Sequence, residues 1–101
     1  MSGDLPATVV GRSDGLVAIE DIAPKAPVHL LVIPERHLSS FREIDSLPGE
    51  EAERLLGFVA ETAAAAGLED YRVIVNVGPG AGQTVFHLHW HILGGRKLPF
   101  P

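Results

Sequence analysis

Three histidines alternate with three apolar residues near the end of the chain, and no other feature of the sequence constrains the fold as strongly. The segment is His87-Leu88-His89-Trp90-His91-Ile92-Leu93. Successive side chains of a β-strand point to opposite faces of a sheet, whereas a helix would scatter these histidines around its surface. The spacing therefore predicts a strand over residues 87–93, with three imidazoles on one face and an apolar trio packed in the core on the other.

Four more apolar segments predict the remaining strands of a sheet. Aliphatic or β-branched runs cover residues 8–11, 16–20, 28–33 and 71–76. The dipeptide Asp14-Gly15 between the first two is typical of a hairpin turn. Residues 21–27 contain two prolines and are expected to form a loop.

One amphipathic helix is predicted between the third and fourth strands. Asp45 or Ser46 is expected to cap it, because short polar side chains accept hydrogen bonds from the first free N–H groups. Gly67 is expected to end it in a left-handed conformation. The residues expected on its apolar face are Ala52, Leu55, Leu56, Val59 and Ala63.

This order of elements predicts the α+β class, as a five-stranded antiparallel sheet with one long helix on one face. A chain of 101 residues with 46% hydrophobic residues suits one domain over residues 1–101. The net charge of −5 argues against a nucleic acid partner, and the absence of cysteine excludes disulfides and thiolate sites. With no long apolar run and no signal-like start, we expect a cytoplasmic protein without a membrane partner.

Histidines on one face of a strand allow three interpretations. They can be structural residues without chemistry. They can chelate zinc or copper, although a structural site normally takes four protein ligands and a catalytic site usually takes three plus water, with supporting carboxylates that are not adjacent here. They can perform phosphate chemistry, in which one neutral imidazole attacks phosphorus and others hold the oxygens and the leaving group.

Other polar residues fit the phosphate interpretation but are weak alone. The glycine-rich segment 78–82 runs into Gln83-Thr84 and can form a nest of N–H groups or simply a flexible turn. Asn76 can meet a phosphate or ribose oxygen, and Asp21 can accept ribose hydroxyls or cap a turn. A lone histidine such as His29 is more often structural, and His37 is expected on the surface.

Together these residues resemble the histidine triad (HIT) superfamily, whose motif is His-x-His-x-His followed by two apolar residues. Segments 21–29, 31–34, 75–76, 82–85 and 94–96 also match, and the chain looks most like the HINT branch of purine nucleoside phosphoramidases. The resemblance covers nearly the whole chain.

The resemblance implies hydrolysis of nucleoside 5′-phosphoramidates through a covalent nucleotidyl-histidine, without a cofactor or metal. His89 would be the nucleophile, and His91 would donate to a phosphate oxygen or to the leaving amine. His87 and His29 would fix the orientation and tautomer of the nucleophile. HINT-like proteins are homodimers, which implies pairing that would bury the hydrophobic strand near residues 71–75.

The same resemblance implies a purine nucleotide pocket. Asp21 and Ile22 would contact the ribose and the base. The α-phosphate would be surrounded by Asn76, Gly82, Gln83, Thr84, His89 and His91.

The chain departs from the HINT pattern in three places. The N-terminal helix of the family is expected to be absent, Glu35 stands where the family often has lysine, and residues 96–101 lack a tryptophan. Two alternatives therefore stay open. One is a dinucleoside polyphosphate hydrolase of the sister branch, whose approach to the triad is also met by Gln83-Thr84-Val85-Phe86-His87. The other is a non-catalytic nucleotide- or metal-binding protein.

Overall fold

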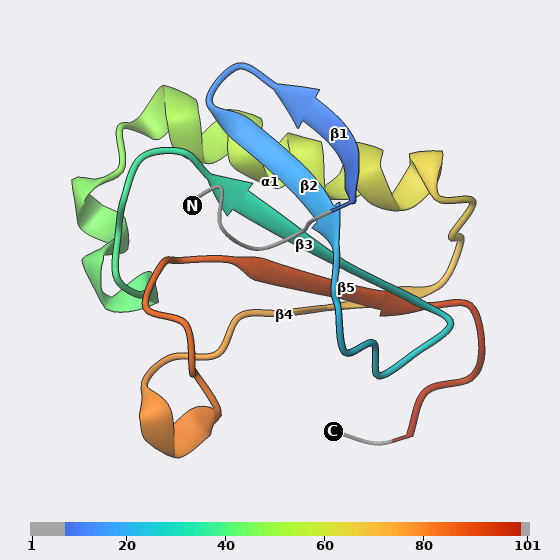
Figure 1. Ribbon diagram of the computed structural model, residues 1–101. Coiled ribbons are helices and arrows are strands. Elements are labelled where there is room, and N and C mark those ends of the chain that lie inside the picture. Colours follow the sequence, from blue (N-terminus) through green and yellow to red (C-terminus); the bar gives the residue numbers. More distant parts are fainter. Residues whose placement is uncertain (1–7, 100–101) are drawn as a thin grey trace.

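A computed structural model describes residues 8–99, in which five strands form one antiparallel sheet with a long helix along one face (Figure 1). The elements are β1 (Val9–Ser13), β2 (Leu16–Glu20), β3 (Val28–Pro34), the 3₁₀ helix η1 (Phe41–Ser46), α1 (Gly49–Ala65), β4 (Tyr71–Ile74), the 3₁₀ turn η2 (Pro79–Ala81) and β5 (Trp90–Gly94). The strand order is β1-β2-β3-β5-β4, and each neighbouring pair is antiparallel. The predicted fold class is confirmed.

The first hairpin forms where the sequence predicts it. Asp14 and Gly15 make the turn between β1 and β2, and Gly15 adopts a left-handed φ of 73°. Such a φ strains any side chain with a Cβ atom, so glycine suits this position. β3 then pairs with β2 on one side and with β5 on the other, which makes it the central strand.

The start of the helix differs from the prediction. Asp45 and Ser46 lie in the last turn of η1, and α1 begins only after Pro48, which makes no side-chain capping bond. Proline fixes φ near the helical value and so starts a helix without a polar cap. The predicted cap was therefore wrong, whereas Gly67, with φ of 79°, follows the last turn as expected.

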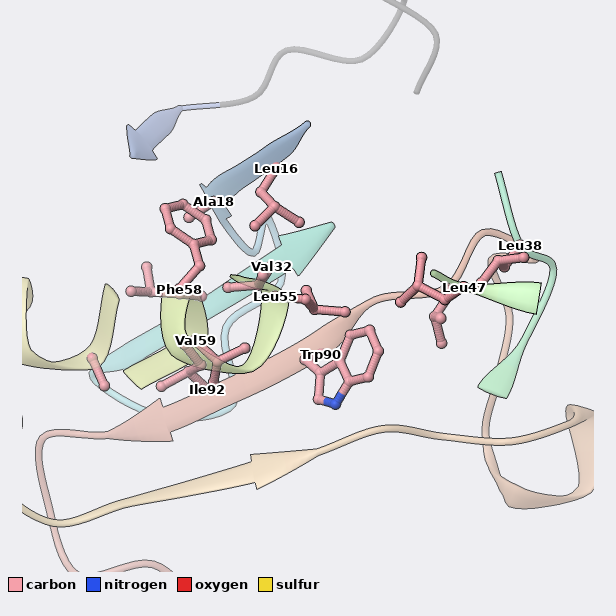
Figure 2. Packing of buried hydrophobic residues seen from close by; sticks show 13 residues of the cluster. Leu16, Ala18, Val32, Leu38, Leu47, Leu55, Phe58, Val59, Trp90 and Ile92 are labelled. Atoms are coloured by element: carbon pink, nitrogen blue, oxygen red, sulfur yellow. The ribbon is translucent and has the colours of Figure 1, made fainter. Parts of the chain in front are cut away.

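The apolar face of α1 is rotated from the predicted stripe. Leu56 is 61% exposed, while Phe58 is buried. The buried residues of the helix are Leu55, Phe58, Val59, Thr62 and Ala63. They pack on Leu88, Trp90 and Ile92 together with side chains from β2 and β3 (Figure 2). Because residues 55, 58, 59 and 62 repeat at helical spacing, the contact with the sheet selects a face centred near Leu55 and Thr62, with Phe58 at its edge.

The histidine segment is only partly a strand. β5 begins at Trp90, and residues 87–89 precede it, so the predicted strand over 87–93 started too early. The Leu88 N–H donates to the Leu38 carbonyl at 2.7 Å, in the segment after β3, and not to a strand neighbour. The alternation nevertheless holds, because Leu88, Trp90 and Ile92 are buried beneath α1 and the histidines between them are less buried.

Two other predicted segments also differ in detail. β4 ends at Ile74 and not at Asn76, and residues 79–81 form η2 within the glycine-rich segment. Expectations about the start and the last two residues of the chain fall on residues 1–7 and 100–101, outside the described residues. Among residues 8–99, no helix is long and apolar enough to cross a lipid bilayer.

Candidate active site

The sheet face opposite α1 carries the candidate site. Ile19, Leu31, His91 and Ile74 are successive cross-strand partners across β2, β3, β5 and β4, so they form one row on this face. Leu31 also packs against Val17, Ile19 and Ile33, which are buried and form a separate cluster from the main core. This apolar cluster lies beside His91 on the same face of the sheet.

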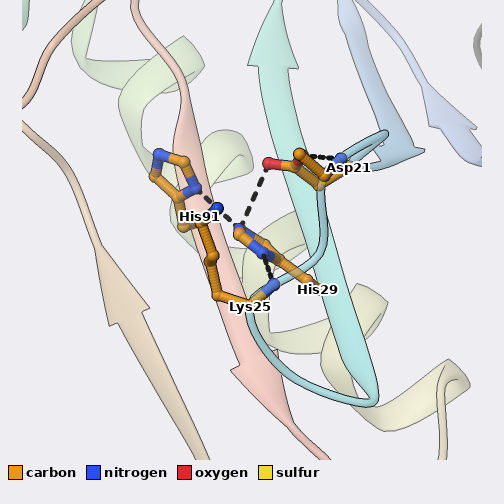
Figure 3. A network of polar contacts seen from close by, with 5 residues as sticks. Asp21, Lys25, His29 and His91 are labelled. Carbon is orange, nitrogen blue, oxygen red and sulfur yellow. Dashed lines mark hydrogen bonds and ion pairs between the residues drawn. The ribbon is translucent and has the colours of Figure 1, made fainter.

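Asp21, His29 and His91 form one polar network on the same face (Figure 3). The Nε2 atom of His29 lies 2.9 Å from Nδ1 of His91 and 3.3 Å from Oδ2 of Asp21. The other carboxylate oxygen, Oδ1, accepts a hydrogen bond from the Ala23 N–H at 2.8 Å. The loop between β2 and β3 therefore holds the carboxylate against His29, which is 6% exposed.

The backbone fixes the tautomers in this network. The Lys25 N–H donates to Nδ1 of His29 at 3.0 Å, so Nδ1 carries the lone pair and Nε2 carries the proton. That Nε2–H donates to Nδ1 of His91, which must then carry its own proton on Nε2. His91 therefore has an N–H donor at Nε2, the ring nitrogen that does not contact His29.

Burial keeps these imidazoles neutral. It lowers the pKa of His91 to about 4, and the neighbouring His89 and His29 lower it further, against a smaller opposing effect of Asp21. Burial likewise lowers the pKa of His29, partly offset by Asp21. At neutral pH His91 is therefore an uncharged donor, and a bound anion beside it would raise its pKa.

His89 is oriented by the backbone of its own segment. Its Nδ1 atom lies 2.7 Å from the carbonyl oxygen of His87. A carbonyl oxygen only accepts, so Nδ1 of His89 carries a proton, and in the neutral tautomer of this ring Nε2 keeps its lone pair. The His89 ring also lies edge-on to that of His91, with centroids 5.0 Å apart. A neutral imidazole in this state is a nucleophile at Nε2.

His87 contacts the last residue of β3 and the segment that follows it. Its Nε2 atom donates to the Pro34 carbonyl at 2.7 Å, and its Nδ1 atom lies 3.1 Å from Nδ1 of His37. Burial lowers the pKa of His87, which favours a neutral ring with its lone pair at Nδ1. His37, expected on the surface, is exposed as predicted but contacts the triad, a contact that depends on β3 lying next to β5.

The glycine-rich segment is held by the buried amide of Gln83. Its Oε1 atom accepts from the Gly78 N–H at 2.9 Å, and its Nε2 atom donates to the carbonyls of Ser39 and Val85 at 2.7 and 3.1 Å. Gln83 is 4% exposed. The side chain of Gln83 is thus occupied with loop contacts that its place in the sequence did not reveal.

The other predicted pocket residues lie at the ends of these segments. Gly82 has a φ of 97°, and a Cβ atom built on it would lie 4.0 Å from the side-chain amide of Asn76, so these two residues adjoin. Thr84 and Ile22 are exposed, Ile22 at 77%. The structure thus joins His29 to His91, and not to His89 as a support for the nucleophile, and it leaves Thr84 and Ile22 accessible.

Asp21, His29 and His91 place one ligand atom each within 4.8 Å of one another, as a metal site would. The hydrogen bonds do not suit a metal, because His29 would have to coordinate through Nε2. That atom carries the proton while Nδ1 accepts from the Lys25 N–H. A metal-bound histidine normally donates from its other nitrogen, so the arrangement fits proton positioning and not coordination.

Comparisons with known proteins identify the family and the fold. An uncharacterised HIT-like protein of Synechococcus elongatus is 45% identical over 103 residues, which cover 97% of this chain and 87% of the relative. The crystal structure of a HIT family hydrolase from Legionella pneumophila superposes with a TM-score of 0.89 at 40% identity, covering 98% of this chain and 90% of that one. A histidine triad protein from Clostridium difficile gives a TM-score of 0.85 at 38% identity, covering 98% and 88%. The HIT domain family model matches residues 2–98, and the chain belongs to the HIT family.

Proposed function

We propose that this protein is a hydrolase of the HINT type, which cleaves nucleoside 5′-phosphoramidates through a nucleotidyl intermediate on His89. The observation that carries the proposal is the hydrogen bond from Nδ1 of His89 to the His87 carbonyl, since it leaves the Nε2 lone pair available beside the N–H donor of His91. Solved relatives at 40% and 36% identity, from Legionella pneumophila and Clostridium thermocellum, are named HIT family hydrolases.

The reaction proceeds in two displacements at phosphorus. The bound phosphate raises the pKa of His91, so that His91 takes up a proton from water when the substrate binds. In the first displacement, Nε2 of His89 bonds to the α-phosphorus, the P–N bond breaks, and the amine leaves with a proton from the His91 imidazolium, which becomes neutral; His29 and Asp21 lie behind this ring. In the second, water attacks phosphorus and gives a proton to neutral His91, the P–Nε2 bond breaks, and the nucleoside monophosphate is released.

The sheet face offers matching contacts for the rest of the nucleotide. The exposed Ile22 suits a purine ring, and Asp21 suits the ribose hydroxyls. Asn76, Gly82 and Thr84 surround the α-phosphate with His89 and His91, while Gln83 contributes by holding the loop that presents them.

A second copy of the chain completes the proposed enzyme as a homodimer. β4 is an edge strand of the sheet formed by the described residues, and its residues Tyr71 and Val73 are 39% and 43% exposed. An apolar edge strand of this kind is a ready partner for another strand. Its pairing across a twofold axis would join two sheets.

The test is release of AMP from adenosine 5′-phosphoramidate in the presence of a chelator, comparing the wild type with His89→Ala. We expect turnover by the wild type and a loss on the order of 10⁴- to 10⁶-fold in the variant, as for removal of other nucleophiles. Mass spectrometry of the quenched wild type should show one added nucleotidyl group. The surface variant Leu56→Ala, far from the chemistry at 61% exposure, serves as the control.

Three results would count against the proposal. Unchanged turnover in His89→Ala would show that His89 is not the nucleophile. Faster cleavage of a diadenosine polyphosphate would favour the sister branch of the family. Tight zinc or nucleotide binding without turnover of either substrate would favour a non-catalytic binding protein.

A further inference from the structure

The end of β3 and the segment after it contact the start of the triad at three points. Pro34 accepts from Nε2 of His87 at 2.7 Å through its carbonyl, and His37 meets Nδ1 of His87 at 3.1 Å. The Leu38 carbonyl accepts from the Leu88 N–H at 2.7 Å. We call these contacts the 34–38 clamp. They hold both the ring of His87 and the peptide that follows it.

The hydrogen bonds of the clamp require one tautomer of His37. The Pro34 carbonyl only accepts, so the proton of neutral His87 is on Nε2 and its Nδ1 atom is an acceptor. The contact at 3.1 Å therefore needs a proton on Nδ1 of His37. Without that proton, two lone pairs would face each other.

The clamp acts on the nucleophile through one peptide group. The carbonyl of His87 and the N–H of Leu88 belong to the same planar unit. Its N–H is bound to the Leu38 carbonyl, and its oxygen accepts from Nδ1 of His89. Any rotation of this peptide moves the acceptor that fixes the tautomer and direction of the His89 ring.

We propose that His37 is a positioning residue for His89, acting through His87 and the peptide between His87 and Leu88. The proposal rests on the proposed function, in which His89 is the nucleophile. His37 is exposed, lies outside the hydrophobic core and touches His87 with only its ring. Its removal thus frees His87 to turn without taking apolar contacts from the core.

The position of the donor atom gives a sharp test. The side-chain nitrogen of asparagine can occupy the place of Nδ1 of histidine, whereas that of glutamine reaches toward the place of Nε2. We therefore compare His37→Asn, which keeps a donor at the required point, with His37→Gln, which moves it. Arg36→Met is the matched control, because it removes the Arg36–Glu51 ion pair of the same segment without touching the clamp.

The first measurement is ¹⁵N NMR of the histidine side chains in substrate-free protein at pH 8, above the ordinary imidazole pKa. The wild type, His37→Asn and Arg36→Met should show His89 protonated on Nδ1. His37→Gln should show a mixture of both neutral tautomers at His89. A single Nδ1–H tautomer in His37→Gln as well would overturn the proposal.

The second measurement is kinetic, on the phosphoramidate. We expect kcat of His37→Gln to fall about tenfold, the worth of one lost hydrogen bond, with KM within about twofold of the wild type. His37→Asn and Arg36→Met should keep the wild-type kcat. Equal kcat in His37→Asn and His37→Gln would contradict the positioning role.

Failure of the proposal differs from failure of the proposed function. A wild type that does not hydrolyse the phosphoramidate refutes the proposed function, while the NMR comparison still decides whether His37 orders the His89 ring. Normal turnover with no tautomer change in His37→Gln refutes the role of His37 and leaves the proposed function standing. Thermal unfolding of each variant shows whether a loss comes from the fold.

Discussion

Acid should weaken the folded state through His91. Burial lowers the pKa of this imidazole to about 4, against 6.5 in its ordinary state, and His89 and His29 act in the same direction. Between pH 4 and pH 6.5 the His91 side chain is protonated in the unfolded chain but neutral in the folded protein. The contribution of neutral His91 to stability is therefore fully present above pH 6.5 and is lost as the pH falls toward 4.

The size of this loss follows from the pKa difference. One pKa unit corresponds to about 1.4 kcal/mol, so the full difference corresponds to about 3 kcal/mol. The ring keeps some contact with water, which screens part of the effect, and we expect about 2 to 3 kcal/mol. This is a large part of the stability of a small domain.

The variant His91→Asn isolates the effect. Asparagine does not titrate, and its carbonyl oxygen can accept from Nε2 of His29 as Nδ1 of His91 does. Urea unfolding of both proteins between pH 4 and 7.5 should show the wild type losing about 2 to 3 kcal/mol more than the variant on acidification. Leu56→Ala, which changes no ionisable group, should follow the wild-type curve in parallel.

Equal pH dependence in the wild type and His91→Asn would refute the reasoning, as would a wild type that becomes more stable below pH 6. The lowered pKa values of His29 and His87 add a slope common to both proteins. Only the difference between the two curves therefore reports on His91.

Three further predictions concern the fold and the loop. Leu55→Ala should lower the free energy of unfolding by about 2 to 5 kcal/mol, because Leu55 is 1% exposed, whereas Leu56→Ala should stay within about 0.5 kcal/mol in thermal or urea unfolding. Gln83→Leu removes the three hydrogen bonds of a buried amide and should cost about 1 to 3 kcal/mol, with faster amide exchange in the glycine-rich segment. Gly82→Ala should cost about 1 to 2 kcal/mol because of its φ of 97°, whereas Gly80→Ala, which meets open space, should unfold within about 0.5 kcal/mol of the wild type.

Two histidine pairs flank the proposed nucleophile. His29 contacts both His91 and Asp21, and His37 contacts Nδ1 of His87, whose Nε2 atom donates to the Pro34 carbonyl. His89 lies between them and is bound only to the backbone carbonyl of His87 among the hydrogen bonds described. In the proposed mechanism the supporting roles are therefore divided, with one pair acting on the donor and the other acting on the nucleophile.

Alternation in the sequence was sufficient to assign each residue of the triad segment to one face of the sheet. Alternation of side chains is a local property of extended backbone, so the apolar residues 88, 90 and 92 could be placed in the core and the histidines on the opposite face. The bounds of β2 and the left-handed Gly67 after α1 were predicted from equally local patterns. The family motif is also a local pattern, and the roles proposed for His89 and His91 come from it.

Only the tertiary structure decided which groups meet. β5 starts at Trp90, the partner of Val32, although β3 continues to Pro34, because the preceding Leu88 N–H leaves the ladder and donates to the Leu38 carbonyl. The contacts of His29 with His91, of His37 with His87 and of Gln83 with Ser39 join residues 44 to 62 positions apart in the chain. Their pairing depends on β3 lying beside β5, and strand order is set by packing of the whole sheet against α1, which no local pattern encodes.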